Sequence, residues 1–343
     1  MTEQQRKARR KGSAATIYDI AEAAGVNAST VSRALAKPGR VKAETAERVR
    51  EAARRLDYRP NPMARALPTG RMNAVGLIVS DLANPVFFDI VGGAQGAAAL
   101  AGSTLLLASS QEDPEQELVA AQRLAASADG LVLATSRMDD DDIHRLAEST
   151  PVVVVNRDVP GIASIVADPR PGLAASLGHL HGLGHRRVAY VEGPGRSWIN
   201  HRRRAVLEEA AAGLGIALVA TCSREPTLAA GRAALPDVLA TGATAVVAYN
   251  DLLALGLLQR CQEERVAVPG RLSIVGVDDI FGSELSSPRL TTVRSPLRAA
   301  GDAAARWLLD RIGGDDAGAP LAPPAHLATE LVVRGSTGAA PPP

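Results

Sequence analysis

Short apolar runs alternate with longer stretches of helical pattern through most of the chain. The runs are rich in β-branched residues and span Ala74–Val79, Thr104–Ala108, Gly130–Leu133, Val152–Val155, Val188–Val191, Ala245–Ala248 and Leu272–Val277. Strands that alternate with helices indicate βαβ units and parallel sheets. These runs are more numerous than the strands of one ordinary sheet. The pattern therefore predicts an α/β core divided into two lobes.

The segment before this core has the periodicity of three short helices. Thr16 is a candidate N-cap with Asp19 three residues on, and Gly25 suits the end of the first helix. A second helix is expected over Ala28–Leu35 and a third over about Ala43–Leu56. The apolar positions that share a face are Ile17, Ile20, Ala21 and Ala24, then Val31, Ala34 and Leu35, then Val49, Ala52, Ala53 and Leu56.

The outer face of the second helix carries small side chains and one arginine. Ala28, Ser29, Ser32 and Arg33 lie outside its apolar face. Two helices joined by a tight turn, the second with small exposed residues, suit the major groove of DNA. Arg33 can then reach a guanine with two hydrogen bonds. The alternative is a small helical bundle without a ligand.

A short proline-flanked segment follows the third helix. Asn61 can cap a helix, Pro62 suits a first turn and Pro68 ends it. About two turns are too few to persist alone in water, so this helix should form only when it docks. The alternative is a proline-rich linker that is never helical.

Charge is distributed unevenly along the chain. Residues 1–71 hold 16 basic and 7 acidic residues, a net of +9, whereas residues 72–343 have a net of −8. A basic head on an acidic body is typical of a nucleic-acid-binding module carried by another domain. From charge alone, a solvated basic tail without a partner fits equally well.

Composition and motifs narrow the function classes. With 46% hydrophobic and 22% charged residues, two cysteines, and neither a secretory signal nor a membrane span, a cytoplasmic globular protein is expected. His179, His181 and His185 do not share a helical face, which argues against a metal site. There is no nucleophile motif, phosphate loop or cofactor motif. A transcriptional regulator is favoured over a soluble binding protein and over an enzyme.

Several separate motifs resemble the LacI/GalR family of bacterial repressors. They are TIYDIAEAAGVNASTVSRAL, RVKAETAERVREAARRLDYRPNPMARAL, VGLIVSDLANPVFF, HLHGLGHRRVAYVEGP, VVAYNDLLALGLL, LSIVGVDDI and SPRLTTVRSP, within residues 16–335. The resemblance implies a helix-turn-helix head and a periplasmic-binding-protein-like core with three crossovers. It also implies a homodimer on a near-palindromic double-stranded DNA operator, controlled by a small-molecule effector. No leucine heptad follows Arg334, so a dimer is expected and not a tetramer.

The resemblance assigns DNA-binding roles by position. Ala28, Ser29 and Arg33 match base-reading residues, Thr16, Tyr18, Asn27, Ser32 and Asn61 match phosphate-side residues, and Thr30 and Arg40 complete the expected set. Leu67 matches a leucine that wedges into the minor groove, where apolar side chains kink DNA. Lys42 departs from the small hydroxyl residue usual at the start of the third helix.

The resemblance to the family also implies the domain boundaries. We expect a basic disordered tail at 1–15, the head at 16–60, the hinge helix and linker at 61–71, the core at 72–335 and a disordered tail at 336–343. Within the core, the first lobe should comprise about 74–167 and 296–324. The second should comprise about 168–295 and 325–335.

Polar residues that follow the predicted strands are candidates for the effector site. Ligands of open α/β sheets bind beyond the carboxyl ends of the strands. By position in the family, the expected effector-binding residues are Ser80, Phe87, Asn156, Arg203, Asn250 and Asp278. Each polar residue could instead cap the next helix. Pro226, Ser295 and the pair Val206-Leu207 depart from the pattern of sugar-binding relatives, so a sugar is only weakly favoured over a nucleobase or an organic acid.

Overall fold

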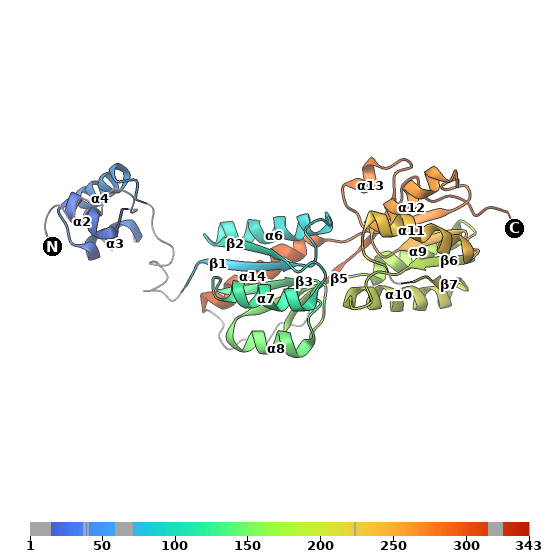
Figure 1. Cartoon of the computed structure of the whole chain (residues 1–343), viewed down its shortest axis with the longest axis horizontal. Coiled ribbons are helices and arrows are strands. Elements are labelled where there is room, and N and C mark those ends of the chain that lie inside the picture. The colour runs from blue at the N-terminus through green and yellow to red at the C-terminus, as the bar shows by residue number, and fades with distance from the viewer. Residues whose placement is uncertain are drawn as a thin grey trace. The chain divides into compact units, whose positions relative to one another are not determined.

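The computed structural model describes residues 15–36, 39, 41–58, 71–222, 224–314 and 325–342. The chain divides into two compact units, Met1–Met72 and Asn73–Pro343 (Figure 1). The expected DNA contacts Arg40, Asn61 and Leu67 lie outside the described residues, as do residues 1–14, most of the predicted hinge, and 315–324 of the first lobe.

The N-terminal unit contains three short helices around one apolar cluster. They are α2 (Ile17–Ala24), α3 (Ala28–Ala36) and α4 (Ala43–Arg55). The Thr16 side chain and Asp19 form the predicted capping box, and Gly25 ends α2 with a φ of 65°. Ile20, Val31 and Val49 have no exposed surface in the cluster. Lys42 makes no side-chain cap for α4, consistent with its departure from a hydroxyl residue.

The first lobe of the C-terminal unit is built on a six-stranded sheet with the order β11-β5-β4-β3-β1-β2. Every strand pair in it is parallel. The strands are β1 (Ala74–Val79), β2 (Thr104–Ser109), β3 (Gly130–Ala134), β4 (Val152–Val155), β5 (Ala163–Asp168) and β11 (Ala325–Ala328). Its helices are α6 (Val86–Leu100), α7 (Pro114–Ala125), α8 (Asp140–Ser149) and α14 (Leu297–Gly313), of which α6 packs on α14.

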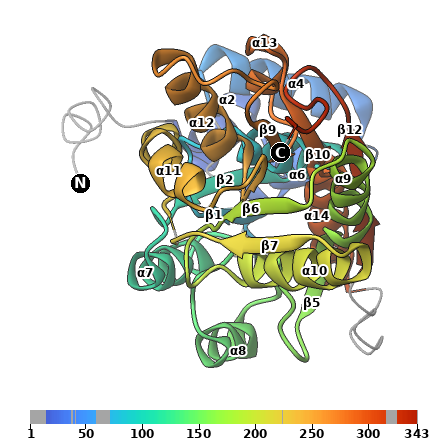
Figure 2. The same cartoon turned by 90° about the vertical axis from the view of Figure 1, so that its right-hand side faces the viewer.

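The second lobe repeats this arrangement with the order β12-β10-β9-β8-β6-β7, in which only the edge strand β12 is antiparallel. Its strands are β6 (Arg187–Val191), β7 (Ala217–Ala220), β8 (Ala245–Ala248), β9 (Ser273–Asp278), β10 (Thr291–Arg294) and β12 (Glu330–Val332). Its helices are α9 (Arg170–Gly182), α10 (Trp198–Leu214), α11 (Leu228–Ala240), α12 (Asp251–Glu263) and the short α13 (Gly282–Leu285). Helices α11 and α12 cover one face, and α9 and α10 the other (Figure 2).

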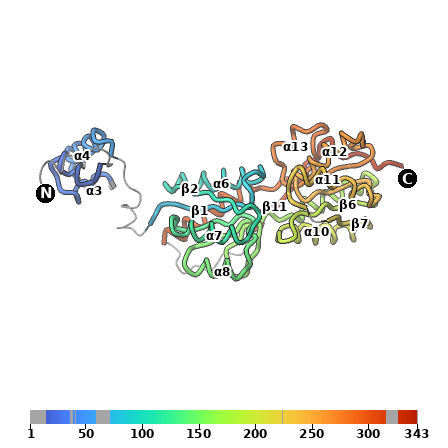
Figure 3. Tube along the Cα trace, in the orientation of Figure 1, coloured from blue at the N-terminus to red at the C-terminus, as the bar shows by residue number. Residues whose placement is uncertain are grey.

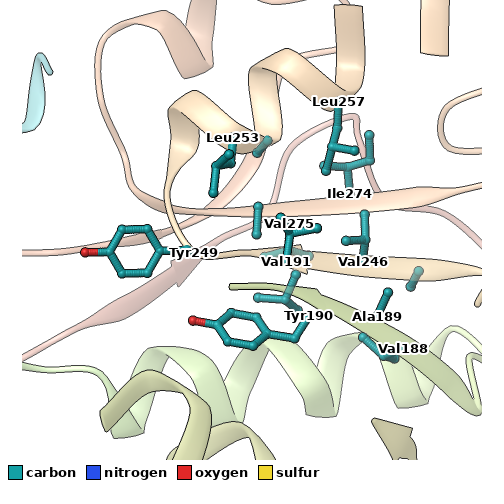
Figure 4. Packing of buried hydrophobic residues seen from close by; sticks show 14 of the residues in the cluster. Val188, Ala189, Tyr190, Val191, Val246, Tyr249, Leu253, Leu257, Ile274 and Val275 are labelled. Carbon is teal, nitrogen blue, oxygen red and sulfur yellow. The ribbon is translucent and has the colours of Figure 1, made fainter. Parts of the chain in front are cut away.

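Both sheets have the apolar interior that buried parallel strands require. Tyr190, Val246 and Val275 belong to the cluster between the second sheet and its helices (Figure 4). The same figure shows the rings of Tyr190 and Tyr249 pointing to one side, with their hydroxyls away from the aliphatic side chains. Strands β6 and β8 both finish at this end of the sheet. The tyrosine hydroxyls therefore lie at the carboxyl edge of the sheet.

The chain crosses between the lobes three times, after β5, after β10 and between β11 and β12 (Figure 3). Thr329 joins two of the crossings, because its hydroxyl donates to the Asp168 carbonyl at 2.8 Å and accepts from the Gly172 amide at 3.0 Å. The expected assignment of 325–335 to the second lobe is therefore wrong in part. Residues 325–328 form β11 beside β5 in the first sheet, and the second lobe begins again at β12.

The C-terminal segment also differs from the expectation of a disordered tail. Ser336 has no exposed surface, and its hydroxyl accepts from the Thr291 amide at 2.8 Å. His185, equally buried, contacts the Gly338 carbonyl at 3.1 Å. The Ala340 amide donates to the Leu183 carbonyl at 2.8 Å. These backbone and side-chain hydrogen bonds fix the segment to the second lobe, although its Gly- and Pro-rich composition resembles that of a flexible tail.

Candidate DNA-binding surface and ligand cleft

Helix α3 carries five of the eight predicted DNA contacts that lie within the described residues. Ser29, Ser32 and Arg33 are exposed, whereas Ala28 and Thr30 are half-buried. Asn27 is also exposed, and its carbonyl accepts from the Thr30 amide at 2.8 Å at the start of α3. The Nε of Arg33 donates to the Ser29 carbonyl at 3.1 Å, and a terminal nitrogen donates to the Ser29 hydroxyl at 3.3 Å. This places the guanidinium along the outer surface of α3, next to small side chains.

The N-terminus of α2 carries the two other described DNA-contact candidates. Tyr18 is 74% exposed, so its hydroxyl is available to a partner. Thr16 is exposed but already engaged, because its hydroxyl donates to the Asp19 carboxylate at 2.7 Å. Its amide also donates to that carboxylate at 2.8 Å, and its carbonyl accepts from the Asp19 and Ile20 amides, so Thr16 contributes first to the start of α2.

A cavity of about 30 Å³ lies between the two lobes at the carboxyl ends of their strands. It is lined by Asn84, Val86, Phe87, Ile90, Glu112, Thr135, Arg137, Asn156 and Leu297 of the first lobe, and by Ile199, Arg203, Pro226, Tyr249, Asn250 and Asp278 of the second. Ligand pockets usually measure roughly 300–1,000 Å³. The lobes thus enclose a polar cleft that their own side chains largely fill.

Backbone conformation is unusual at the strand ends that form this cleft. Glu112, Thr135, Asn156 and Asp278 have φ values of 62°, 57°, 56° and 110°. Such angles are uncommon outside glycine and are most costly for a β-branched residue such as Thr135. Backbone strain of this kind is retained only where the surrounding structure enforces it, and strained residues are common at binding sites.

A buried ion pair lies on the second-lobe side of the cleft. Arg203, from α10, donates to the Asp278 carboxylate at 2.7 Å, and the two side chains are 7% and 6% exposed. The guanidinium also lies over the Tyr249 ring, 4.8 Å from its centroid. Burial opposes the charge on Arg203, but Asp278 and Tyr249 raise its pKa overall. Arg203 is thus held as a cation against the floor of the cleft.

A second ion pair lies on the first-lobe side. The Nε of Arg137 donates to the Glu112 carboxylate at 2.7 Å, and their side chains are 3% and 24% exposed. A terminal nitrogen of Arg137 also donates to the Thr135 carbonyl at 2.6 Å. Each lobe therefore presents one arginine–carboxylate pair to the cleft, and the four side chains together carry no net charge.

Two buried donors in the cleft have no partner among the described residues. The Oδ1 of Asn250 caps α12 by accepting from the Leu253 amide at 3.0 Å, as the alternative interpretation of this residue proposed. Its Nδ2 and the Nε of Arg203 remain without a hydrogen-bond acceptor in the described structure. Because buried donors without partners are costly, both nitrogens favour a ligand that offers acceptor oxygens.

Five of the six predicted effector residues line the cavity, namely Phe87, Asn156, Arg203, Asn250 and Asp278. Ser80 does not line it: its hydroxyl faces Thr135 and bonds to the carbonyl of that residue at 3.1 Å. Sequence reasoning missed Glu112, Arg137 and Tyr249. The available signal was that each lies close to the end of a predicted strand, and Tyr249 directly precedes a predicted site residue.

Asp251 organises the floor of the cleft from below. It is 1% exposed, and its carboxylate accepts from the Ile280 amide at 2.9 Å, the Ser283 hydroxyl at 2.7 Å and the Thr292 hydroxyl at 2.6 Å. These bonds join the start of α12 to the loop after β9 and to β10. Asn250 directly precedes Asp251, and Asp278 precedes Ile280 by two residues. The hydrogen bonds of Asp251 therefore hold both of these cleft residues in place.

The buried His185 and the neighbouring His179 have structural partners. His185 contacts the Thr244 hydroxyl at 2.8 Å, and His179 contacts the Thr337 hydroxyl at 3.0 Å. Within the described ranges, no three side chains of the types that hold metal ions come together. In the same ranges, no helix is long and apolar enough to cross a membrane.

A basic head with an exposed, arginine-bearing helix, followed by a two-lobed core with a polar cleft, defines a DNA-binding regulator with a ligand-sensing domain. Residues 16–61 match the domain described as bacterial regulatory proteins, lacI family, and residues 177–337 match the periplasmic binding protein-like domain. The HTH-type transcriptional repressor CytR of Escherichia coli K12 is 31% identical over 98% of this chain and 100% of its own length.

Solved structures agree with the sequence matches. A Lac repressor dimer bound to operator and the anti-inducer ONPF superposes with a TM-score of 0.86 and 28% identity, covering 95% of this chain and 100% of that one. A transcriptional regulator CelR–cellobiose complex gives a TM-score of 0.68 and 27% identity, with coverage of 94% and 99%. This chain belongs to the LacI family of bacterial regulatory proteins, and it is a DNA-binding transcriptional regulator.

Proposed function

We propose that the protein is a cytoplasmic repressor that binds a near-palindromic operator as a homodimer. Binding of a small molecule in the cleft between the lobes controls its affinity for DNA. The observation that carries this proposal is the pair of features on one chain: an exposed α3 with Arg33 in a basic head, and a cleft with two unpartnered buried donors. Because the relatives are transcriptional regulators, the proposal assigns no enzymatic activity.

We assign base reading to Ser29 and Arg33, with Ala28 allowing α3 to approach the bases. Ser29 and Ser32 are exposed and short, so the backbone of α3 can come close to the floor of a major groove. Arg33 is preoriented along α3 by its contacts with Ser29. Thr16, Tyr18, Asn27, Thr30, Ser32 and Arg40 are assigned to the phosphate side, with Asn61 and Leu67 assigned to a hinge in the minor groove.

Dimerisation is supported by apolar side chains exposed on both lobes. Phe281 and Leu285, near α13, are 65% and 78% exposed, and Leu228 at the start of α11 is 39% exposed. On the first lobe, Phe88 of α6 is 55% and Leu107 of β2 is 41% exposed. Where such side chains form a contiguous patch, a partner usually covers them. A second copy would cover them, as the Lac repressor is described as a dimer.

The chemistry of the cleft favours a neutral, hydroxyl-rich ligand, which makes a sugar the leading class. Arg137 pairs with Glu112 and Arg203 with Asp278, so no positive charge is left to neutralise an organic acid. Carboxylates accept hydrogen bonds from hydroxyls, and arginine and asparagine nitrogens donate to them. The CelR relative binds cellobiose. A nucleobase is the second candidate, since Phe87 and Tyr249 could contact its faces.

Two measurements test this proposal. Random duplexes selected by the full chain should yield a two-fold symmetric consensus, with two chains bound per site. A thermal-shift screen of sugars, nucleosides and organic acids should give stabilisation by a neutral polyol. A selected site without symmetry would overturn the dimeric mode of binding, and stabilisation by organic acids alone would overturn the assignment of ligand class.

A further inference from the structure

An ion pair joins the two lobes next to the cleft. Arg196, in the loop between β6 and α10 of the second lobe, donates to the carboxylate of Asp139 in the first lobe at 3.3 Å. Their side chains are 63% and 76% exposed. Asp139 follows the cavity-lining Arg137 by two residues. Arg196 directly precedes Ser197, whose hydroxyl lies 3.2 Å from that of the cavity-lining Tyr249. The ion pair therefore bridges the rim of the cleft.

Asp139 bonds to the second lobe although it occupies the N-cap position of α8. An aspartate at this position usually accepts a hydrogen bond from the backbone of its own helix. The Asp139 side chain makes no such bond. The next acidic residues pair within the first lobe, because Asp140 binds Arg157 at 2.5 Å and Asp142 binds Arg145. The Asp139 carboxylate is therefore available to the other lobe.

The loop that carries Arg196 is fixed within the second lobe. The Gly193 amide and the Tyr190 hydroxyl both donate to the Oδ1 of Asn200 at 2.9 Å. The Ser197 hydroxyl accepts from the Asn200 amide at 3.3 Å, and both of these side chains are buried. The loop consequently moves together with the second lobe, so the ion pair resists movement between the lobes.

The ion pair lies on the side of the sheets away from the crossovers. The chain crosses between the lobes at β5, β10, β11 and β12, which are the two strands at one edge of each sheet. Asp139 follows β3, two strands from β5, and Arg196 follows β6, three strands from β10. At roughly 4.8 Å per strand, these positions are about 10 and 14 Å from the crossovers. Lobes that rotate about the crossovers separate further on this side, so opening breaks the ion pair.

We propose that the Asp139–Arg196 ion pair is a salt-sensitive latch that favours the closed arrangement of the lobes. An exposed ion pair changes an equilibrium constant by up to about fivefold, and salt screens it. The latch therefore adjusts the fraction of molecules with an open cleft and does not determine the fold. Because the closed cavity measures only about 30 Å³, an effector enters after the latch breaks. This consequence rests on the proposed function, whereas the latch itself concerns the core without DNA or effector.

The open fraction can be measured through the reactivity of a cysteine placed between the lobes. Ile199 lines the cavity and is 3% exposed, so the thiol of Ile199→Cys becomes accessible when the lobes separate. If opening is fast relative to modification, the reaction rate is proportional to the open fraction, however small that fraction is. Cys222→Ser removes the exposed native thiol, and the fully buried Cys261 remains as an internal measure of unfolding. Mass spectrometry of the modified full chain gives both rates.

Arg196→Glu replaces the attraction to Asp139 by repulsion without altering a buried side chain. At about 0.01 M salt, Ile199→Cys should react at least about twice as fast in this variant as in the parent. Asp139→Arg combined with Arg196→Glu restores opposite charges and should return the rate to that of the parent. At about 1 M salt, where the Debye length is roughly 3 Å, all three proteins should react alike.

The matched control is Arg145→Glu, which reverses an arginine that is 68% exposed and pairs with Asp142 of the same helix. It should keep the parental rate. A parental rate in Arg196→Glu would overturn the proposal, as would an equal rise in Arg145→Glu or a raised rate that persists in the charge-swapped double variant. An equal rise at Cys261 would also overturn it, because unfolding would then explain the change. Selection of operator DNA by the parent tests the proposed function separately.

Discussion

The carboxylate of Asp251 accepts a hydrogen bond of 2.6 Å from the Thr292 hydroxyl, and this bond joins the first turn of α12 to strand β10. Asp251 is fully enclosed, and Gly276 packs directly against it: a Cβ at Gly276 would lie 2.1 Å from the Asp251 Oδ1. The pair therefore joins α12 to residues within β9 and β10.

The stability of the core should depend on pH through Asp251. Burial and the nearby Asp278 raise the pKa of Asp251 to about 7, from 3.8 in an unfolded chain. The folded state thus binds the proton more tightly, so this residue's contribution is complete below about pH 4 and is lost as the pH rises through 7. Between pH 5 and pH 8 the loss is about 2–3 kcal/mol, at about 1.4 kcal/mol per pKa unit.

Urea unfolding of the wild type and of Asp251→Asn at both pH values measures this effect. The difference between the two proteins cancels the other titrating groups, including His179 and His185, whose pKa values are lowered by burial. The free energy of unfolding of wild type should fall more steeply with pH than that of Asp251→Asn. Parallel pH profiles would show that Asp251 has an ordinary pKa in the folded protein.

Close packing of α11 on α12 should make Gly256 intolerant of a side chain. A Cβ at Gly256 would lie 2.2 Å from the Leu228 carbonyl oxygen, and the helices meet there backbone to backbone. Gly256→Ala should lower the free energy of unfolding by about 1–3 kcal/mol, because overpacking forces backbone shifts.

Gly213→Ala provides the matched control for Gly256→Ala. Gly213 lies in α10 with open space around its Cβ position. Alanine there should be neutral or should stabilise the protein by up to about 1 kcal/mol, as alanine favours helix. Equal effects of the two substitutions in thermal unfolding would mean that the α11–α12 contact is looser than described.

The sequence predicted the strands that are buried along their whole length, and it also predicted the partly exposed β2 and β6 and the serine-containing β9. All residues of β1, β3, β4 and β8 are buried, and each was predicted as an apolar run. Strand β5 was missed, although a serine also lies within the predicted run Leu272–Val277. The Ser164 hydroxyl is satisfied locally by the Ile162 carbonyl at 3.2 Å. The short edge strands β11 and β12 depend on partners far away in the chain, which no local pattern records.

The site was predictable where a polar residue lies within two positions of the end of an apolar strand. Asn156 and Asn250 satisfy that rule and line the cavity. Ser80 satisfies it too, but its hydroxyl bonds to Thr135 and points away from the cavity. Arg137 lies three residues beyond its strand, and its placement depends on the left-handed conformation of Thr135 and on Glu112 from the turn after β2. These are tertiary constraints that sequence alone did not reveal.

Arg33 should determine base preference, whereas other head arginines should contribute only charge. Arg33→Ala should cost about 1–3 kcal/mol per lost bidentate contact and relax selectivity at one symmetric pair of positions. Arg55→Ala, on the exposed side of α4, removes the same charge and should weaken specific and random DNA alike. Competition binding against random duplexes at two salt concentrations separates the effects. If both variants lost affinity for specific and random DNA equally, the base-reading role of Arg33 would be wrong.

The effector response should depend on Arg203 and Asp278, but single substitutions there will also affect stability. The two side chains are 7% and 6% exposed, so removing either one leaves a buried charge without a partner and should cost about 3–5 kcal/mol. Arg203→Met combined with Asp278→Asn removes both charges at once and should retain the fold. It should also retain operator binding, which is assigned to the head.

The same double variant should lose both stabilisation by the strongest compound of the thermal-shift screen and the effect of that compound on operator affinity. An effector shifts DNA affinity only through its different affinities for the two lobe arrangements, so losing its contacts must remove the response. The exposed pair Arg232–Glu263, joined at 2.7 Å in the second lobe, is the matched control: Arg232→Met with Glu263→Gln should leave binding and response unchanged. The cleft variant could instead keep its affinity for the compound while the compound no longer changes its affinity for operator DNA. In that case Arg203 and Asp278 would transmit the signal without contacting the effector.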